Sequence, residues 1–210
     1  MLRRAAREIR AGMTVNLGIG LPTKVLAYVP HDLPVCLHSE NGIAGVGPVL
    51  DRAYANRNLI DAGGAYVSAI DGTSYFDSAV SFAMVRGGRI DLTLLGAFEV
   101  SGGGDLASWI IPGKFTPGAG GAIELAQKAR RVAVVTTHVD KAGRPKIVDK
   151  CALPLTARGH VARIFTDMAV IDIVPEGPRL IELAEGISIA EVEAATGTRL
   201  LVADTPLPTF

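Results

Sequence analysis

The sequence predicts an α/β protein built on a mainly parallel sheet with helices on both faces. Short apolar runs, such as 90–95 and 132–136, are typical of strands that are buried on both faces of a sheet. They alternate with segments of helical periodicity, such as 123–129. Glycine- or proline-containing turns separate them, and no internal repeat or change in composition divides the chain. We therefore expect residues 1–210 to form a single domain.

The first half of the chain is expected to begin with an amphipathic helix that Gly12 ends. The elements predicted up to residue 73 are, in order, that helix at 2–10, a strand at 13–17, a turn at 18–20, a helix from Pro22 to about Tyr28, a strand at 33–37, a tight turn at 39–42, an irregular surface excursion at 48–61, a strand at 66–70 and a turn at 71–73.

The second half continues the alternation. Ser74 and Asp77 are both candidate caps for a helix that ends near Arg86. The elements predicted after it are strands at 90–95 and near 98–104, a glycine-rich loop at 110–121, a helix at 123–129, strands at 132–136, 161–165 and 168–173, and a final helix at 189–196.

The composition excludes several classes of function. Lysine plus arginine and aspartate plus glutamate both number 21, so the formal net charge is zero, which argues against nucleic acid as the main partner. No apolar run reaches the roughly 18 residues that a membrane span needs. The arginine-rich start contains Glu8 and no serine, which favours a first helix over a transit peptide. We expect a cytoplasmic protein.

The cysteines and histidines give no sign of a metal or redox site. Cys36 and Cys151 each lie in an apolar stretch, which favours buried, reduced thiols. The four histidines are scattered, and no cysteine pair has zinc-ligand spacing. We expect no metal and no bound cofactor.

Glu40 follows the apolar run 33–37 by three positions, as the second residue of the turn Ser39–Gly42. In parallel sheets, ligands bind outside the carboxyl ends of the strands, so this carboxylate is placed where a ligand is expected. A glutamate has an unperturbed pKa of about 4.3 and is ionised at pH 7. It can therefore attack a thioester carbonyl without a general base. The alternative is a solvated residue in an ordinary Asn-Gly turn.

Two glycine groups are candidate ligand loops. The group 18–20 and the group 42–47 lack the spacing of a dinucleotide-binding loop. Gly45 and Gly47 nevertheless suggest that backbone can approach a ligand closely beyond the turn. The group 118–121 precedes a predicted helix, where backbone N–H groups can bind an anion or a developing oxyanion. A plain surface loop is the alternative.

Several motifs together resemble the B-type chain of the 3-oxoacid CoA-transferases, two-subunit enzymes that use a glutamate nucleophile. The resemblance is collinear over nearly the whole chain. It rests on the segments 15–22, Ser39-Glu40-Asn41-Gly42, 82–88, 111–114, 118–122, 151–156 and 166–173. It implies a three-layer fold like that of CoA-transferases and sugar-phosphate isomerases.

The resemblance also implies a reaction and a set of site residues. CoA passes from an acyl-CoA, with succinyl-CoA as the expected donor, to a 3-oxoacid such as acetoacetate or 3-oxoadipate, through a glutamyl-CoA thioester on Glu40. The backbone amide of Gly121 supplies one oxyanion donor, and an A-type subunit in an A2B2 assembly supplies the other. The residues implied in substrate or CoA binding are Asn41, Gly42, Lys114, Gly118 and Gly120.

The chain departs from the family pattern at His38, where glutamine is more usual, and at Phe115, Thr116 and Ala119, which replace larger apolar residues. These changes concern the choice of substrate more than the reaction. Two other functions stay open at this point: a sugar-phosphate isomerase-like enzyme, since fold does not fix function, and a non-catalytic acyl-CoA-binding subunit.

Overall fold

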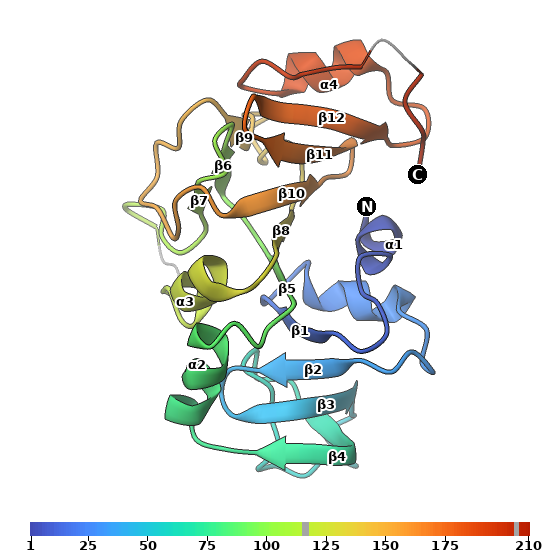
Figure 1. Ribbon diagram of the computed structural model, residues 1–210, viewed down its shortest axis with the longest axis vertical. Coiled ribbons are helices and arrows are strands. Elements are labelled where there is room, and N and C mark those ends of the chain that lie inside the picture. The colour runs from blue at the N-terminus through green and yellow to red at the C-terminus, as the bar shows by residue number, and fades with distance from the viewer. Residues whose placement is uncertain (115–117, 204–205) are drawn as a thin grey trace.

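The computed structural model describes residues 1–114, 118–203 and 206–210 (Figure 1). The elements follow one another in the order α1 (Leu2–Ala6), β1 (Thr14–Leu17), the 3-10 helix η1 (Thr23–Tyr28), β2 (Cys36–Ser39), β3 (Ile43–Val49), β4 (Val67–Tyr75), α2 (Ser78–Arg86), β5 (Leu92–Leu95), β6 (Glu99–Ser101), β7 (Leu106–Ala107), α3 (Ala122–Lys128), β8 (Val132–Val135), β9 (Ile147–Val148), β10 (Val161–Phe165), β11 (Ala169–Val174), β12 (Gly177–Leu183) and α4 (Ile189–Ala195).

Within the described residues, the strands form a nine-stranded sheet and a smaller three-stranded sheet. The large sheet has the order β12-β11-β10-β8-β5-β1-β2-β3-β4, and it runs along the long axis of the molecule (Figure 1). The central strands, from β10 to β2, are parallel. The strands at both ends pair antiparallel. The α/β prediction is confirmed, with a parallel centre and antiparallel ends.

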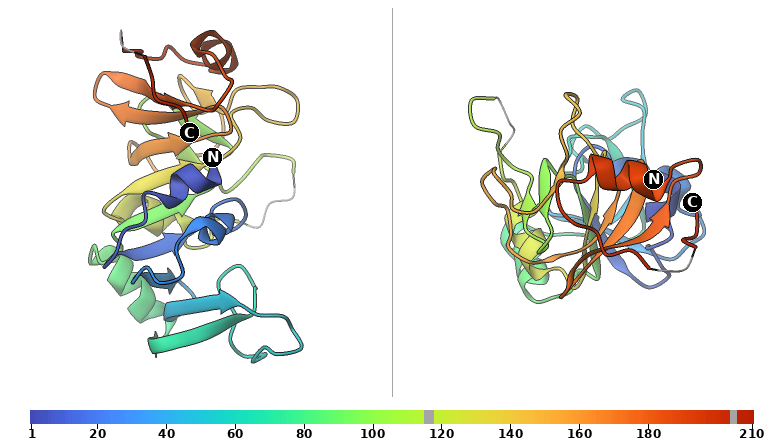
Figure 2. Two further views of the ribbon diagram at one scale, coloured as in Figure 1. Left: turned by 90° about the vertical axis from the view of Figure 1, so that its right-hand side faces the viewer. Right: turned by 90° about the horizontal axis from the view of Figure 1, so that it is seen from above.

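The central strands are covered on both faces, as their apolar sequences predict. All four residues of β8 are buried. Ala133 and Val135 pack in a cluster with the residues of α1, whereas Val132 and Val134 pack in the cluster that contains α3 and α4. In Figures 1 and 2, α1 and η1 lie on one side of the sheet and α2 and α3 on the other. The predicted helices on both faces are therefore confirmed.

The helix ends follow the expected signals, with some changes in length. Asp77, one of the two candidate caps, begins α2, and its carboxylate accepts a hydrogen bond from the Val80 amide at 2.8 Å. The first helix ends at Ala6, earlier than predicted, because residues 7–9 continue as tighter turns with i to i−3 hydrogen bonds. The helix expected from Pro22 is a 3-10 helix with Pro22 as its N-cap.

The glycines after Glu40 have a different role from the predicted one. They belong to β3, which pairs with both β2 and β4. A Cβ on Gly47 would overlap the Ser68 hydroxyl of β4, and Gly45, at φ +88°, faces Thr73. The open side of these glycines is thus occupied by a neighbouring strand and not by a ligand.

Two further strand predictions need correction. The turn expected at 71–73 lies inside β4 as an irregularity, where Gly72 has φ +86° and the Ile70 amide bonds to the Thr73 hydroxyl at 2.8 Å. The strand β12, which contains Pro178, was not predicted. It pairs with β11 near the edge of the sheet, where a proline is tolerated. No described helix is both long enough and apolar enough to cross a membrane.

Candidate active site

Glu40 lies at the carboxyl end of β2, in the tight turn that joins β2 to β3. The placement after a strand is as predicted, and the side chain is half-buried. The turn requires glycine at position 42, since φ is +121° and a Cβ would overlap the Phe76 carbonyl oxygen. The Phe76 amide donates to the Gly42 carbonyl at 3.0 Å. The backbone of the turn that carries Glu40 is therefore held in a conformation that requires glycine at position 42.

The side chain of Asn16, on β1, forms a hydrogen bond with the Glu40 carboxylate. Its side-chain nitrogen Nδ2 donates to Glu40 Oε2 at 3.1 Å. The parallel pairing of β1 with β2 brings Asn16 opposite His38, two residues before the glutamate. Asn16 is buried, 1% exposed, so its amide is a rigid polar group in an otherwise apolar strand.

His38 extends this polar row to α2. Its Nδ1 is 3.3 Å from Asn16 Nδ2, and its Nε2 is 3.0 Å from the Ser81 hydroxyl. The ring stacks on Phe76 with a centroid separation of 6.3 Å. Burial lowers the pKa of His38 below its ordinary value of 6.5, although the nearby Glu40 charge acts to raise it. The imidazole is therefore neutral near pH 7.

Gly121 meets Glu40 from the opposite side. A Cβ at this position would lie 2.9 Å from Glu40 Cγ and 3.1 Å from the Phe82 ring. The backbone of Gly121 has φ −79°, a value that any residue adopts, so glycine is needed for space and not for conformation. The predicted glycine group and the predicted glutamate are thus in contact range, although they are far apart in the sequence.

The other predicted site residues lie around this pair. Asn41 is exposed, and its Nδ2 donates to the Ile60 carbonyl at 2.8 Å. This bond ties the excursion, which spans 50–66 between β3 and β4 and not the predicted 48–61, to the Glu40 turn. Lys114 is exposed, and its amide donates to the Ile111 carbonyl. Gly118 and Gly120 have φ +94° and +48°. Phe115 and Thr116, two of the departures from the family pattern, lie outside the described residues.

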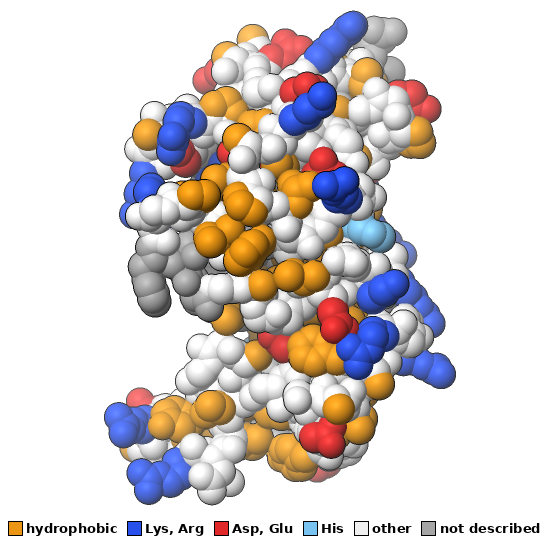
Figure 3. Space-filling view, turned by 90° about the vertical axis from the view of Figure 1, so that its left-hand side faces the viewer, with side chains coloured by type: hydrophobic (Ala, Val, Ile, Leu, Met, Phe, Trp, Pro, Cys, Tyr) orange, Lys and Arg blue, Asp and Glu red, His pale blue; other side chains and the backbone are white. Residues whose placement is uncertain are grey.

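The excursion leaves the far end of β3 and folds back to the Glu40 turn, where the Ala62 amide donates to the Ser39 hydroxyl at 2.8 Å. Figure 2 shows it as one of several loops that project from the body of the molecule, and Figure 3 shows a hollow above it. It carries the exposed residues Arg52, Tyr54 and Arg57. Because Asn41 bonds to Ile60, the space in front of Glu40 is bordered by this loop.

A mainly apolar cavity of about 470 Å³ lies beside the Glu40 turn. Val15, Leu17 and Leu37 line it, and they pack with the α1 cluster. Its lining also includes Ser39 of the turn and Asp61 of the excursion, whereas Glu40 is not among the lining residues.

The described part of the chain gives no sign of a metal or thiol site. No group of three or more His, Cys, Asp or Glu residues there is arranged to hold a metal ion. Cys36 and Cys151 are free thiols and half-buried. Burial raises the pKa of Cys151 to about 12, so that thiol stays protonated.

Sequence reasoning missed Asn16 and Ser81. A signal for Asn16 was present, since an asparagine in the apolar run Val15-Asn16-Leu17 is unusual in a buried strand. Ser81 carries no such signal, because a serine is common on a helix surface. Its contact with His38 depends on how α2 packs on the sheet.

Comparison with known proteins identifies close relatives over most of the chain. The family model described as "Coenzyme A transferase" matches residues 1–195. The B chain of a probable succinyl-CoA:3-ketoacid coenzyme A transferase from Bacillus subtilis is 47% identical over 207 residues, covering 99% of this chain and 96% of the relative. The B chain of the 3-oxoadipate CoA-transferase of Acinetobacter baylyi is 46% identical over 200 residues, covering 95% and 92%.

Longer relatives and solved structures add the fold context. A rat mitochondrial succinyl-CoA:3-ketoacid coenzyme A transferase 2A is 45% identical, and this chain spans 38% of its length. An acyl-CoA transferase apoenzyme from Escherichia coli O157:H7 superposes with a TM-score of 0.78 at 21% identity, over 100% of this chain and 42% of that one. The decarboxylase AibA/AibB gives a TM-score of 0.73 at 21% identity, over 99% and 86%. A transferase and a decarboxylase therefore share this fold, so the fold alone does not decide the reaction.

Proposed function

Because this chain belongs to the coenzyme A transferase family, we propose that it is the B-type subunit of an enzyme that moves CoA from an acyl-CoA to a 3-oxoacid. Succinyl-CoA is the proposed donor, and acetoacetate or 3-oxoadipate the proposed acceptor. The names of the relatives support this choice. The observation that carries the proposal is the Glu40 carboxylate, which is half-buried, held by Asn16 and in contact range of Gly121.

The proposed reaction begins with attack of a Glu40 oxygen on the thioester carbonyl carbon. The C–S bond breaks, CoA leaves as a thiolate, and Glu40 and the acyl group form a mixed anhydride. The thiolate then attacks the Glu40 carbonyl and displaces the donor acid, which leaves CoA on the enzyme as a glutamyl thioester. The acceptor carboxylate reverses these steps. Atoms and charges balance without a metal or a redox cofactor.

The surrounding residues have separate proposed roles. The Asn16 amide fixes the orientation of the attacking carboxylate, which keeps it near a productive geometry. The Gly121 N–H is proposed as a donor to the oxyanion that forms at the thioester carbon. Losing one such donor typically raises the barrier by about 3–4 kcal/mol. A second hydrogen-bond donor, from the A-type subunit, would complete this oxyanion hole.

An A-type partner is part of the proposal, and the surface of the chain supports it. The relatives carry B or beta designations in their names, which imply a second kind of chain.

Exposed large apolar side chains gather at the β3–β4 end and next to it, namely Ile19, Val49, Tyr54, Ile60, Ile70 and Tyr75. At the opposite end, β12 is covered by the C-terminal segment through bridges to Leu201 and Thr209. Among the described residues, the β4 edge is bonded only at its start, where the Val67 amide donates to the Leu59 carbonyl, and has no bridge beyond it. We propose that the A-type subunit covers it.

Intact-mass measurement tests the proposed function. The chain, co-expressed with its A-type subunit, is mixed with succinyl-CoA or acetoacetyl-CoA. We expect this chain to gain the mass of CoA less one water. The gain should be absent in Glu40→Gln, which keeps the size of the side chain and removes the nucleophile.

A matched control is Glu176→Gln, a change at an exposed glutamate between β11 and β12, at the opposite end of the large sheet. It should acquire the adduct like the unmodified chain. If a folded complex forms no adduct with either acyl-CoA, the covalent mechanism is wrong. The isomerase-like or acyl-CoA-binding alternatives would then take its place.

A further inference from the structure

The Asn16 amide has one chemically possible orientation. Its Nδ2 lies within hydrogen-bond distance of the His38 carbonyl oxygen at 3.1 Å and of Glu40 Oε2 at 3.1 Å. Neither a backbone carbonyl nor an ionised carboxylate can donate a hydrogen bond. The NH2 group must therefore face them, and rotating the amide would place Oδ1 against two oxygens.

That orientation favours one tautomer of His38. The same Nδ2 lies 3.3 Å from His38 Nδ1, so its two N–H groups serve three acceptors and one N–H is shared between Nδ1 and the His38 carbonyl oxygen. A proton on Nδ1 would oppose that N–H, which favours an unprotonated Nδ1. The ring proton is then on Nε2, which donates to the Ser81 hydroxyl at 3.0 Å. Ser81 is fully buried on α2, and the ring itself is 4% exposed, so water does not compete for either nitrogen.

The other end of the Asn16 amide has no partner to hold it. Asn16 Oδ1 is buried, and within the described residues it has no hydrogen-bond partner. Thr93, its neighbour across the sheet on β5, has a buried hydroxyl that is likewise unpaired within those residues. The orientation of the amide thus depends on its NH2 end, where the acceptors are His38 and Glu40 itself.

We infer that His38 is a positioning residue for the nucleophile: as the neutral Nε2–H tautomer, held by Ser81, it locks the Asn16 amide with an N–H directed at the Glu40 carboxylate. The structural part of this inference stands on the contacts alone. Its effect on turnover rests on the proposed function of Glu40.

Protonation of His38 would break the arrangement. An imidazolium carries N–H at both nitrogens, so Nδ1 would oppose the Asn16 N–H as a second donor. The groups that face the ring are uncharged on β1, β3 and α2, namely Asn16, Ala44 and Ser81, and Phe76 stacks on it. Among the described residues, Glu40 is the charged group that acts on it. The arrangement is therefore lost as the pH falls through the lowered pKa of His38.

Two substitutions separate this role from simple packing. A glutamine at 38 offers one acceptor and one donor, like the neutral imidazole, but does not titrate. A leucine is similar in size and offers neither. Steady-state kinetics of the complex with the A-type subunit would give kcat and KM for the acyl-CoA between pH 5 and 8.

We expect His38→Gln to keep kcat at pH 8 within about threefold, since its hydrogen bonds persist, and to keep activity to lower pH than the unmodified chain. His38→Leu should lose kcat by about 10²-fold, the size of effect known for a misplaced reacting group, with KM little changed. Equal kcat in His38→Leu and the unmodified chain would overturn the inference. A fall of kcat at low pH in His38→Gln that matches the fall in the unmodified chain would overturn it as well.

A spectroscopic measurement keeps the inference testable if a variant fails to fold or the proposed function is wrong. Nitrogen NMR of the ¹⁵N-histidine-labelled protein at pH 7 should show His38 with a proton on Nε2 and an unprotonated Nδ1. Ser81→Ala should lower the fraction of His38 that carries its proton on Nε2. A proton on Nδ1 would refute the inference even if the enzyme forms the CoA adduct. Absence of the adduct with the expected tautomer would refute the proposed function alone.

Discussion

At the scale of single residues, two glycines near Glu40 are required for different reasons. Gly42 is needed by the backbone, because its φ of +121° and the adjacent Phe76 carbonyl exclude a side chain. Gly121 has an ordinary backbone and is needed because Glu40 and Phe82 occupy the space where a Cβ would lie. A substitution at 121 therefore acts on the carboxylate more than on the fold.

Gly121→Ala should reduce kcat by about 10²-fold because the new methyl group displaces Glu40 Cγ, which lies 2.9 Å away. The free energy of unfolding should fall by only about 1 kcal/mol, the low end for overpacking. Kinetics of the complex and urea unfolding of the chain measure the two effects. Gly103→Ala is the matched control, since its Cβ would meet only the Ser101 hydroxyl at 3.8 Å. Normal activity in Gly121→Ala would contradict the assigned contact.

At the scale of elements, the two ends of the large sheet differ. The β12 end is covered by the chain's own C-terminal segment, whereas β3 and β4 carry exposed apolar side chains. The hairpin also supports the Glu40 turn, because the Phe76 segment after β4 bonds to Gly42 and the excursion bonds to Asn41. A partner that covers the hairpin would thus be adjacent to Glu40.

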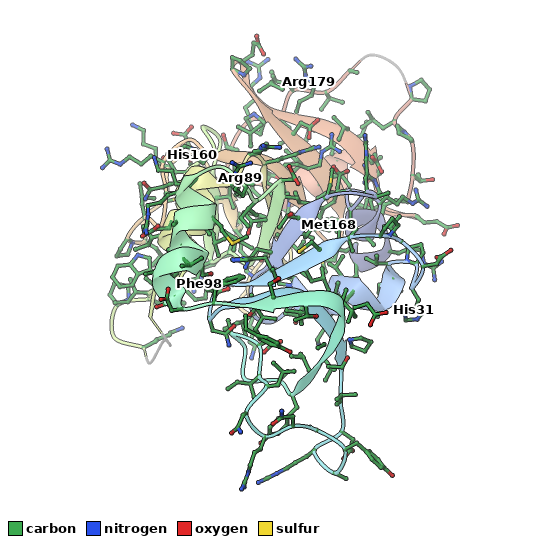
Figure 4. The ribbon with its side chains drawn as sticks, turned by 60° about the horizontal axis from the view of Figure 1, so that its bottom comes forward. His31, Arg89, Phe98, His160, Met168 and Arg179 are labelled. Atoms are coloured by element: carbon green, nitrogen blue, oxygen red, sulfur yellow. The ribbon has the colours of Figure 1, made fainter. Side chains whose placement is uncertain are left out.

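Val49→Asp should weaken the association with the A-type subunit at least about tenfold, because a charge on an apolar contact must be desolvated. Val49 is 66% exposed, so the free chain should stay folded. The dissociation constant of the complex measures the effect. The control Arg179→Asp lies at the far end of the sheet (Figure 4) and should bind normally. If the two variants bind alike, the β3–β4 surface is not the interface.

At the scale of the whole molecule, a buried ionic network joins the first helix to the last strands. Glu8, 7% exposed, bonds to Arg4 at 2.9 Å, Arg163 at 2.8 Å and Arg131 at 3.0 Å. Arg4 also bonds to Glu182 of β12. Burial acts to raise the pKa of Glu8, but the three guanidinium groups outweigh it, and the pKa is lowered.

Glu8→Gln should lower the free energy of unfolding at pH 7 by about 1–3 kcal/mol, since it removes a carboxylate that three guanidinium groups share, while Arg4 keeps Glu182 and Arg163 keeps Asp172 as partners. A carboxyl group with a lowered pKa stabilises the fold above its unfolded value, and this contribution is lost as the pH falls through the folded value. The unmodified chain should therefore lose more stability than Glu8→Gln does when the pH is lowered from 7 to 2, because the loss occurs below the ordinary glutamate pKa. Urea midpoints at the two pH values test this.

The exposed pair formed by Glu176 and Arg179 provides the comparison for that network. Glu176→Gln removes a surface contact and should change stability by at most about 1 kcal/mol. Equal losses in Glu8→Gln and Glu176→Gln would show that the buried network contributes no more than a surface ion pair.

The sequence by itself determined the parallel centre of the sheet, the start of α2 near Asp77, the turn that carries Glu40 and the resemblance to the family. These features depend on local patterns: apolar runs, Asp77 before a helix, and an Asn-Gly turn after a strand. Only the tertiary structure decided that β3 and β4 extend the sheet, that Gly121 faces Glu40, and that Asn16, His38 and Ser81 form one network. The physical reason is that strand register and helix packing, which bring Asn16 within reach of His38 from 22 positions away, follow from side-chain packing over the whole core and not from any local run of residues.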